Sequence, residues 1–474
     1  MTAINNKLKN FLTELDDKNI SYISWKNNHE LLDVFSGEGD LDIFVPIENR
    51  HNFINLCKEQ NWIEVSSPVA KHQSISHFYC LGENLEVFHL HVYFKFITGD
   101  SWIKEYSLPL ETWLLNNRIW NKEHNIWVPN NFTQSYLFIV RHLLKCGSLT
   151  GRLLYKFGLD SYKREWESCK TNLDLDQGED PINLKSYIKG SKVYEKKFEM
   201  PKLTTAIFFK ISCLPYMRFK IISLPFRRFF SMVSRIINKL YYKKKKLLKP
   251  KGLIIAISGV DGSGKTTMLD ELDYIFGNFL TINRFHLGKP QGKFIEFIWR
   301  ALVNKTENPL MKENPTSYIS YSKGKALKST ILALLRLKKA RFAKKKSFKG
   351  SLILSDRWPT KEIGKMDGPR IMLEKDTGWF VRSCKRIETW AYNLIPEADI
   401  CYFFEVPLEI AKSRNESRVK KYKETDEMIT DRYLKNSEYK PIAKTIIRFK
   451  NTDDFQMKRN EFIGNVWQHI SEIY

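Results

Sequence analysis

Cysteine is scarce in this chain, and the few cysteines are scattered. Seven occur among 474 residues, and no two of them form a C-x-x-C pair. A disulfide framework or a zinc site needs cysteines at short, regular spacings, so neither is predicted. The pattern is typical of a protein from a reducing compartment.

Long apolar runs are missing as well. The opening residues, MTAINNKLKNFLTELDDKN, contain no apolar region of the kind found in secretory signal peptides. No charge-free apolar stretch approaches the roughly 20 residues that a membrane-spanning helix needs. We therefore expect a cytoplasmic protein, either soluble or bound peripherally at the inner membrane surface. The composition leaves the oligomeric state open.

Asp and Glu are absent from two segments that hold much of the basic charge. The formal net charge is +24. Residues 201–251 contain 14 Lys and Arg, residues 316–350 contain 11, and neither segment has an acidic residue. The remaining chain holds 52 basic and 53 acidic residues, so these two segments account for the whole surplus. Each segment needs its own explanation.

Residues 196–251 are predicted to be a basic linker between two domains. They mix aromatics, prolines and lysines, and Pro215 and Pro225 interrupt any long helix. Residues 226–240 fit a basic amphipathic helix. Three interpretations stay open: contact with an anionic membrane surface, docking on the adjacent domain, and nucleic-acid binding, which is the least favoured.

The second basic segment predicts a long helix from Tyr318 to about Lys346. Its apolar stripe is expected to consist of Ile319, Leu327, Ile331, Leu334 and Leu335. Two interpretations of its lysines stay open. They form the solvated face of a crossover helix, or they attract an anionic substrate or lipid headgroups.

Two domains of different class are predicted on either side of the linker. Residues 252–474 predict an α/β domain, because apolar strands alternate with long helical stretches as in a parallel sheet with crossover helices. These strands are expected at 253–258, 351–355 and 399–405. Residues 1–195 predict a mixed α+β domain with short strands near 21–25, 41–45 and 85–94, and with helices near 4–17, 52–60 and 133–145.

The strand at 253–258 leads into GVDGSGKT, residues 259–266, which fits the pattern G-x-x-x-x-G-K-[ST]. Glycines allow a tight turn that aims backbone N–H groups at phosphate oxygens, and the following helix adds the positive end of its dipole. Lys265 would neutralise the β- and γ-phosphates of ATP, and Thr266 would offer a hydroxyl to Mg²⁺. A strand before the pattern and a helix after it distinguish this site from a chance match.

A second candidate group comes from residues that follow the strand SLILS. This strand ends in Asp356 and Arg357, and in an open parallel sheet the carboxyl ends of the strands face the ligand crevice. Asp356 can hold Mg²⁺ or act on an acceptor hydroxyl, and Arg357 can clamp phosphates. Arg414 and Arg418 lie four residues apart on one helical face, where a mobile pair can close over ATP.

Together these motifs resemble the thymidylate kinase family of P-loop kinases over most of residues 251–474. GVDGSGKTT is similar to the phosphate loop of that family, SDRW to its strand-end motif, and EVPLEIAKSRNESR to the strand and R-x-x-x-R lid. The resemblance implies ATP and Mg²⁺ as cofactors. The predicted cofactor-binding residues are Gly259, Asp261, Gly262, Ser263, Gly264, Lys265, Thr266 and Thr267. The predicted catalytic residues are Lys265, Asp356, Arg357, Arg414 and Arg418, with Thr266 and Asp356 as metal ligands.

The acceptor side departs from that family. NRFHLGKPQGK, residues 283–293, lacks the family's Arg-Glu-Pro-Gly stretch, although Arg284, His286 and Lys289 can still meet an anion. The insert at 358–370 places Asp367 and Arg370 near the expected acceptor mouth. This pattern resembles thymidylate-kinase-like proteins associated with bacterial surface polysaccharide synthesis. It implies a small-molecule acceptor that is a nucleotide, a sugar, a glycan or a glycolipid.

The N-terminal domain holds its own candidate site in SGEGDLDIFVP. Asp40 and Asp42 point to one face of a strand, where two adjacent carboxylates are most simply compensated by a metal. This G-x-D-x-D strand resembles that of polymerase-β-type nucleotidyltransferases, in which the aspartates bind Mg²⁺. His89 stands where that fold carries a third carboxylate. Active nucleotidyl transfer, a degenerate or ligand-binding version, and unrelated structural aspartates all stay open, with Lys26 as a phosphate ligand in the first two.

The sequence thus predicts a P-loop parallel sheet with flanking helices, preceded by a mixed α+β nucleotidyltransferase-like domain. The predicted activity is transfer of the γ-phosphoryl group of ATP to a nucleotide or sugar acceptor. Two other functions stay open. One is a Mg²⁺-dependent nucleotidyltransferase with an auxiliary P-loop domain, and the other is a non-catalytic membrane-binding module that is switched by ATP.

Overall fold

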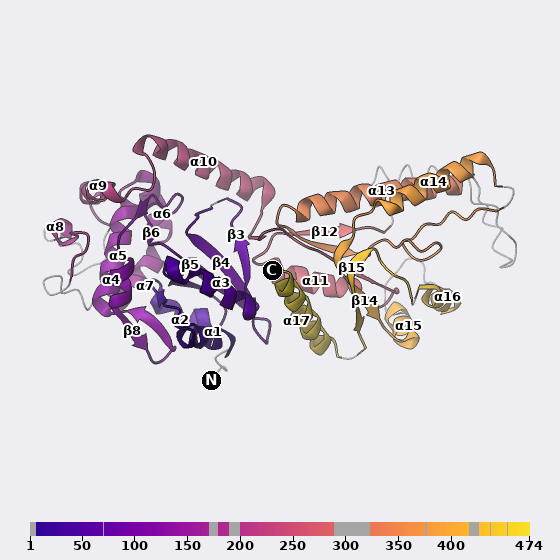
Figure 1. Ribbon diagram of the computed structural model, residues 1–474, viewed down its shortest axis with the longest axis horizontal. Helices are drawn as coiled ribbons and strands as arrows, with labels where there is room; N and C mark the ends of the chain where they lie inside the picture. The colour runs from indigo at the N-terminus through magenta and orange to yellow at the C-terminus, as the bar shows by residue number, and fades with distance from the viewer. Residues whose placement is uncertain are drawn as a thin grey trace. The chain divides into compact units, whose positions relative to one another are not determined.

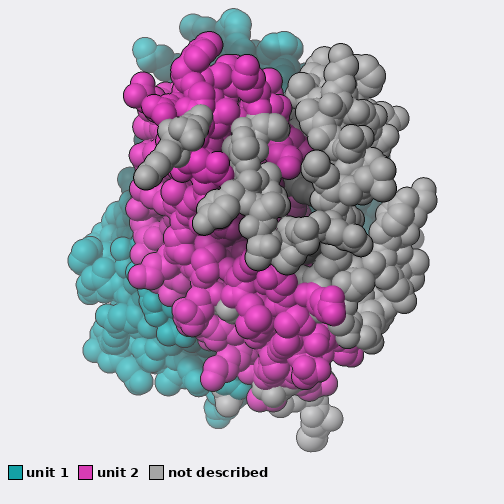
Figure 2. All heavy atoms as spheres, turned by 90° about the vertical axis from the view of Figure 1, so that its right-hand side faces the viewer, with its two compact units in different colours: residues 1–246, 466–474 teal, residues 247–465 magenta. Residues whose placement is uncertain are grey.

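The computed structural model describes residues 6–69, 71–169, 179–188, 200–288, 323–374, 377–416, 426–436, 438–452 and 454–474. The chain forms two compact units, shown in different colours in Figure 2. Unit 1 comprises residues 1–246 and 466–474, and unit 2 comprises residues 247–465. Arg418 and Lys289, which the sequence singles out, lie outside the described residues, as does the first part of the helix predicted from Tyr318.

The sheet of unit 1 is mixed. Its strands lie in the order β1 (Ile23–Ser24), β2 (Asp40–Phe44), β5 (Val87–Tyr93), β4 (Ile75–Leu81) and β3 (Ile63–Ser66). Only β2 and β5 of these neighbours run parallel, and the other pairs are antiparallel. The three predicted strands are β1, β2 and β5, so they are confirmed, whereas β3 and β4 were not predicted.

Three long helices of unit 1 were predicted and are confirmed: α1 (Asn6–Asp17), α3 (Arg50–Glu59) and α5 (Asn131–Cys146). The shorter helices are α2 (Leu31–Phe35), α4 (Glu111–Asn116), α6 (Leu149–Phe157), α7 (Leu159–Cys169) and α8 (Lys185–Ile188). Two hairpins join β6 (Ile97–Thr98) to β7 (Tyr106–Ser107), and β8 (Arg118–Asn121) to β9 (Ile126–Pro129).

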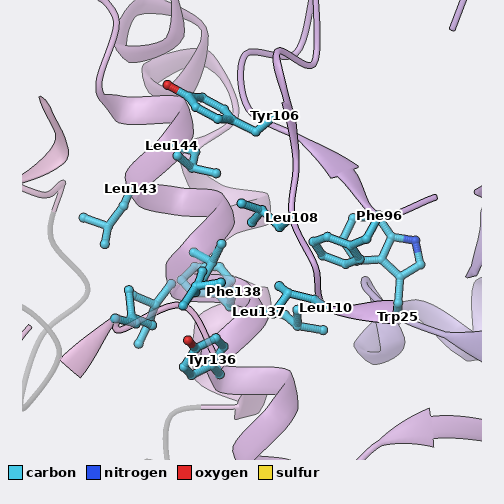
Figure 3. Close-up of a cluster of buried hydrophobic side chains, with 14 of the residues drawn as sticks. Trp25, Phe96, Tyr106, Leu108, Leu110, Tyr136, Leu137, Phe138, Leu143 and Leu144 are labelled. Carbon is cyan, nitrogen blue, oxygen red and sulfur yellow. The ribbon is translucent and has the colours of Figure 1, made fainter. Parts of the chain in front are cut away.

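Helix α5 passes through the core of unit 1. The side chain of Asn130 caps its first turn by accepting a hydrogen bond from the backbone N–H of Thr133. Residues on all sides of the helix are buried, because it packs among the aromatic and aliphatic side chains shown in Figure 3. Each large apolar side chain that is buried there contributes about 1.5–3 kcal/mol to the free energy of unfolding.

Part of the segment predicted as a linker packs into unit 1. Helix α9 (Leu203–Ser212) lies against α5, and Ala206, Phe209 and Cys213 join the same core. Helix α10 (Leu224–Ile237) follows, with Pro225 in its first turn, where proline is tolerated because that N–H has no helical acceptor. A π-helical turn, η7 (Asn238–Tyr242), continues it. The amphipathic helix predicted at 226–240 is therefore confirmed.

Unit 2 contains a five-stranded parallel sheet. Its order is β12 (Ile282–His286), β13 (Leu352–Asp356), β11 (Ile254–Gly259), β14 (Ala398–Glu405) and β15 (Ala443–Lys450). The predicted strands correspond to β11, β13 and β14. Because all neighbours are parallel, the carboxyl ends of β11, β12, β13 and β14 lie along one edge, and the conspicuous polar motifs of the sequence follow these ends.

Helices cover both faces of this sheet (Figure 1). Helices α13 (Lys323–Ser347) and α14 (Trp379–Asn393) pack against one another and over one face. On the other face, Phe462 of α17 (Phe455–Ile473) contacts Tyr402 and Phe404, with ring centroids 5.0 and 5.2 Å apart. The other α-helices among the described residues of unit 2 are α11 (Lys265–Phe276), α15 (Leu408–Glu416) and α16 (Asp426–Asn436). This is the α/β architecture that was predicted.

The stripe predicted for the second basic helix is wrong at two of its positions, whereas Ile331 and Leu335 are half-buried and Ile319 lies outside the described residues. Leu327 and Leu334 are exposed, and α13 instead buries small residues that recur every three or four positions, including Ala326, Ala333 and Ala340. Small side chains let α13 approach α14 and the sheet closely. The helix therefore buries the face that allows this close approach, and not the face with the predicted larger residues.

All seven cysteines are buried free thiols. Burial raises the pKa of Cys80, Cys146, Cys169 and Cys401 to about 12, because the charged thiolate is poorly solvated there. Among the described helices, none is both long enough and apolar enough to cross a membrane.

Candidate functional site: a phosphate loop beside a basic cavity

The loop between β11 and α11 is built around glycines that no other residue can replace without strain. Gly259, Gly262 and Gly264 have φ values of 137°, 87° and 85°, in the left-handed region. A Cβ atom would lie 2.5 Å from the carbonyl oxygen of Phe404 at the first position and 2.8 Å from that of Ala411 at the second. Close approach of backbone to backbone therefore fixes the path of the loop.

Lys265 begins α11, and its side chain turns back into the loop. Its amine donates to the carbonyl oxygen of Val260 at 2.7 Å and lies 3.5 Å from Oγ of Ser263. The lysine is buried, whereas Thr266 and Thr267, which follow it, are exposed. A cation within a glycine loop, at a helix N-terminus and beside exposed hydroxyls, is suited to binding phosphate groups.

Side chains from later in the chain also lie close to the loop. The amide of Asn451, just after β15, donates to the carbonyl oxygen of Ser263 at 2.8 Å. Arg414 of α15 comes close to Gly264, since its Nη1 would lie 3.9 Å from a Cβ atom placed there. Arg414, which the sequence predicts to belong to a lid over ATP, therefore lies near the phosphate loop. Asn451 was missed, because it follows an unremarkable strand 188 residues further along the chain.

Asp356 ends β13, the strand beside β11, and one oxygen of its carboxylate contacts His286 at 3.5 Å. The other oxygen, Oδ1, is buried and has no hydrogen-bond partner among the described residues. Burial opposes ionisation, but the hydrogen bond with His286 and the charge of Lys265 together hold the pKa of Asp356 below its ordinary value. An ionised carboxylate with an unsatisfied oxygen suits a hard cation such as Mg²⁺, so this residue fits its predicted metal role.

Arg357 joins the strand-end motif to the phosphate loop. Its guanidinium donates to Asp261 at 2.8 Å and lies 3.7 Å from Asp367. Burial disfavours its charge, but Asp367 and Asp261 outweigh that effect and raise the pKa of Arg357 above its ordinary value. Its backbone has a φ of 70°, a conformation that costs about 1–3 kcal/mol and that occurs preferentially at functional sites.

A cavity of about 640 Å³ opens beside this ion pair. Among the described residues that line it, five are Lys or Arg and two, Asp261 and Asp367, are acidic. The basic lining residues are Arg336, Arg357, Lys365, Arg370 and Lys435. This excess of positive charge suits an anionic ligand.

Some of the residues that line this cavity were predicted to lie on the acceptor side. His286, Asp367 and Arg370 line it, as predicted. Arg284 does not, because it pairs with Asp270 of α11 at 2.5 Å. Arg336 was missed, since it belongs to a helix whose basic residues were all assigned to solvent or to attraction at a distance.

Arg336 is a buried wall of the cavity rather than a surface charge. It pairs with Asp367 at 2.5 Å and also donates to the carbonyl oxygen of Leu287 and to the hydroxyl of Tyr392, at 2.8 and 2.6 Å. Three acceptors hold the guanidinium in one place. The arrangement fixes the insert around Asp367 against α13 and α14.

The aspartates of unit 1 are compensated by side chains of the protein. Asp42 is buried, and its Oδ1 lies 2.8 Å from both the amine of Lys26 and Nδ1 of His91. Burial opposes ionisation, but Lys26 outweighs it and holds the pKa of Asp42 far below its usual range. Asp40 is exposed and contacts Nδ1 of His89 at 2.5 Å.

Side chains of the protein thus already compensate part of the charge for which the sequence predicted a metal at Asp40 and Asp42. Among the described residues, no group of three or more His, Cys, Asp or Glu side chains could hold a metal ion. The register does place His89 opposite Asp40 on the neighbouring strand β5, as the resemblance to nucleotidyltransferases implies. Lysine and histidine thus supply the positive charge at this strand.

Comparison with known proteins adds little to this picture. No family model and no curated protein matches the chain. Thymidylate kinase from Candida albicans matches 47% of this chain and 92% of its own, at 15% identity and a TM-score of 0.29. Deoxyadenosine kinase from M. mycoides with bound dATP matches 45% of this chain and 98% of its own, at 16% identity and a TM-score of 0.26. A sugar kinase from Janibacter sp. matches 46% of this chain and 95% of its own, at 15% identity and a TM-score of 0.25. At such low TM-scores these likenesses carry no functional weight.

Proposed function

We propose that unit 2 is an ATP-dependent phosphotransferase. It would transfer the γ-phosphoryl group of ATP to a nucleotide, or to a sugar or glycan of the kind used in bacterial surface polysaccharide synthesis. One observation carries the proposal: the phosphate loop and the basic cavity meet at the ion pair between Asp261 and Arg357. A donor site and an anion-binding acceptor site would then share a boundary, which phosphoryl transfer requires.

On the donor side, the loop glycines and Lys265 would hold the β- and γ-phosphates. Thr266 and Asp356 would hold Mg²⁺, which when bound neutralises charge on the transferring group. Arg414, together with Arg418, would stabilise the charge that spreads over the phosphoryl oxygens. The buried, unsatisfied oxygen of Asp356 supports the metal assignment.

On the acceptor side, the basic lining of the cavity would orient an anionic or hydroxyl-rich acceptor. An acceptor oxygen forms a bond to the γ-phosphorus while the bond to the bridging oxygen breaks, so that ADP leaves. The proton of an acceptor hydroxyl passes to a nearby carboxylate, Asp356 or Asp261, and then to solvent. Arg357, which contacts Asp261 and Asp367, would stabilise the charge on the transferred group.

Labelled ATP tests this proposal. The full chain would be incubated with Mg²⁺, γ-labelled ATP and either dTMP or extracted envelope sugars and glycolipids. We expect label in one acceptor fraction, and a loss of at least about a hundredfold in Lys265→Ala. Lys349→Ala, a basic residue outside the site, is the matched control. Equal transfer by Lys265→Ala and wild type would overturn the proposal.

The acceptor fraction that takes up the label decides between substrate classes. Label in dTDP would identify a nucleotide kinase. Label in the glycan fraction alone would identify an envelope-modifying kinase. ATP binding without transfer to either fraction would favour the ATP-switched binding module that the sequence also allows.

The nucleotidyltransferase alternative rests on unit 1. It predicts that Asp40→Asn with Asp42→Asn abolishes activity while Lys265→Ala does not. The ion pairs of Asp42 with Lys26 and His91 favour a ligand-binding or structural role for this strand instead, because two-metal chemistry needs carboxylates that are available to cations.

A further inference from the structure

Helix α10 is attached to unit 1 by its polar side. Arg228 lies 3.2 Å from Glu105 and 3.9 Å from Asp100, two fully buried carboxylates. One helical turn on, Ser231 donates to the carbonyl oxygen of Trp102 at 3.4 Å. Arg235, a further turn along the same side, interacts electrostatically with Asp100. The spacing of three and four residues places this whole set on one side of the helix.

The apolar side of α10 consequently faces solvent. Phe226, Phe229, Phe230 and Ile237 of α10, and Leu240 of η7, lie on the side opposite to Arg228, and between 39% and 67% of each is exposed. Ile221 and Ile222 before the helix, and Tyr241 and Tyr242 after it, extend the exposed apolar surface. Figure 1 shows α10 at the periphery of unit 1. We refer to residues 221–242 as the α10 surface.

This orientation is the reverse of that of an ordinary surface helix. A helix that only docks on its own domain buries its apolar side and exposes its charges, because this removes apolar area from water. Both the polar and the apolar side of α10 are in a favourable environment only if an apolar partner covers the phenylalanines. Soluble monomers rarely expose contiguous apolar patches, and a larger one marks an interaction surface.

The charges around the patch identify what covers it. Residues 201–251 contain no Asp or Glu. Lys220, Arg227, Lys239, Lys243 and Lys245 are exposed along the same segment. Apolar aromatic side chains bordered by lysine and arginine match the acyl boundary and the anionic headgroups of a lipid bilayer. Nucleic acid would match the charges but would leave the phenylalanines in water.

We propose that the α10 surface binds an anionic lipid bilayer. The helix lies in the plane of the interface, with Phe226, Phe229 and Phe230 inserted at the headgroup–acyl boundary and with its lysines at the headgroups. Arg228 and Ser231 keep it attached to unit 1 in this orientation. This proposal does not depend on the activity of unit 2.

Vesicle sedimentation of the full-length protein tests the proposal. Vesicles would contain phosphatidylcholine alone or with about 30 mol% phosphatidylglycerol. We expect binding to the anionic vesicles that weakens as salt rises from about 0.05 to about 0.5 M, because counterions screen the lysines. The triple variant Phe226→Ser/Phe229→Ser/Phe230→Ser should bind at least about tenfold more weakly.

A matched triple variant separates this effect from general loss of hydrophobicity. Tyr274→Ser/Phe348→Ser/Trp379→Ser removes three aromatics of unit 2 that are equally exposed, and it should bind vesicles like wild type. Far-UV circular dichroism melts would establish that both variants are folded. The proposal is overturned if wild type stays in the supernatant with anionic vesicles, or if the α10 triple variant binds as tightly as wild type.

A second copy of the chain is the competing partner for the α10 surface. Light scattering without lipid distinguishes it, since the bilayer proposal expects the same mass for wild type and the α10 triple variant. A wild-type dimer that the triple variant converts to a monomer, with no vesicle binding by either, would assign the α10 surface to a second copy of the chain instead.

Discussion

At the residue scale, the phosphate loop depends on the absence of side chains. The positions of Gly259 and Gly262 leave no room for a methyl group, because main-chain oxygens of β14 and α15 occupy the space. Sequence alone identifies these glycines by their pattern. The structure adds the reason, which is that neighbouring elements press the loop from outside while its inner side stays available for a ligand.

Gly262→Ala tests this packing. The new Cβ would lie 2.8 Å from the carbonyl oxygen of Ala411, and φ at this position is 87°. We expect a loss of about 1–3 kcal/mol in the free energy of unfolding of unit 2 and a clear loss of ATP affinity. Urea unfolding and calorimetric ATP titration measure the two effects. Gly464→Ala, where a Cβ meets no atom within 4 Å, is the control and should retain ATP binding.

His142 predicts how unit 1 responds to acid. It is buried, and burial with the charges of Lys145 and Arg141 lowers its pKa to about 3. The unfolded chain has the ordinary value near 6.5, so as the pH falls below 6.5 the unfolded state takes up a proton that the folded state does not. Stability from this residue is therefore complete above about pH 6.5 and declines by about 1.4 kcal/mol per pH unit down to about pH 3.

His142→Phe should remove this contribution. The ring lies stacked on Tyr155 at 4.7 Å, so phenylalanine preserves its shape. Urea unfolding at pH 7.5 and pH 5 would give a smaller difference between the two pH values for the variant than for wild type. An unchanged difference would show that other groups carry the acid response.

At the scale of elements, local patterns predicted most of what lies close together in the chain. The strand β11, the loop and the start of α11 form one continuous stretch, so the sequence specifies their order and their chemistry together. The sequence also predicted that Asp356 lies near the phosphate loop, because the carboxyl ends of parallel strands lie along one edge of the sheet. Asp42 was expected to need a metal, but the partners that neutralise it, Lys26 and His91, lie on other elements.

The contacts that were not predicted depend on packing between elements that are distant in the sequence. Asn451 reaches the loop only because β15 follows β14 in the sheet, and Arg336 is buried only because α13 uses its alanines for contact. Periodicity alone placed the larger residues Leu327 and Leu334 inside, since it cannot detect that close approach favours small ones. Charge alone placed Arg336 outside, since its three acceptors come from elsewhere in the fold.

The buried pair between Arg336 and Asp367 makes α13 a structural support of the acceptor cavity. Arg336→Met would leave Asp367 buried without this partner, and we expect a loss of about 3–5 kcal/mol in the free energy of unfolding. Arg341→Met, an exposed arginine of the same helix, should change stability by less than about 0.5 kcal/mol. Chemical denaturation measures both variants.

The double variant Arg336→Met/Asp367→Leu separates charge from packing. It removes both members of the ion pair, so most of the lost stability should return while binding of an anionic acceptor stays weak. If the double variant is as unstable as Arg336→Met, packing around the methionine rather than the uncompensated carboxylate would be the cause.

At the scale of the whole molecule, the two units have separate cores and separate candidate sites. We expect two unfolding transitions in calorimetry, of which ATP with Mg²⁺ raises only the one that belongs to unit 2. At an ATP concentration about a hundredfold above Kd, the stabilisation amounts to about 2.7 kcal/mol. Lys265→Ala should abolish the shift and leave both transitions otherwise in place. A shift of both transitions by ATP would contradict independent unfolding.

The seven buried thiols make the protein well suited to site-directed labelling. Thiol-reactive probes need an accessible thiolate. Burial makes the native cysteines inaccessible to the probe and keeps their thiols protonated. A single cysteine introduced at an exposed position of α10, for example Phe230→Cys, would then react selectively with a spin label or a fluorophore. The wild-type background can therefore report on the environment of one chosen residue without a cysteine-free variant having to be made first.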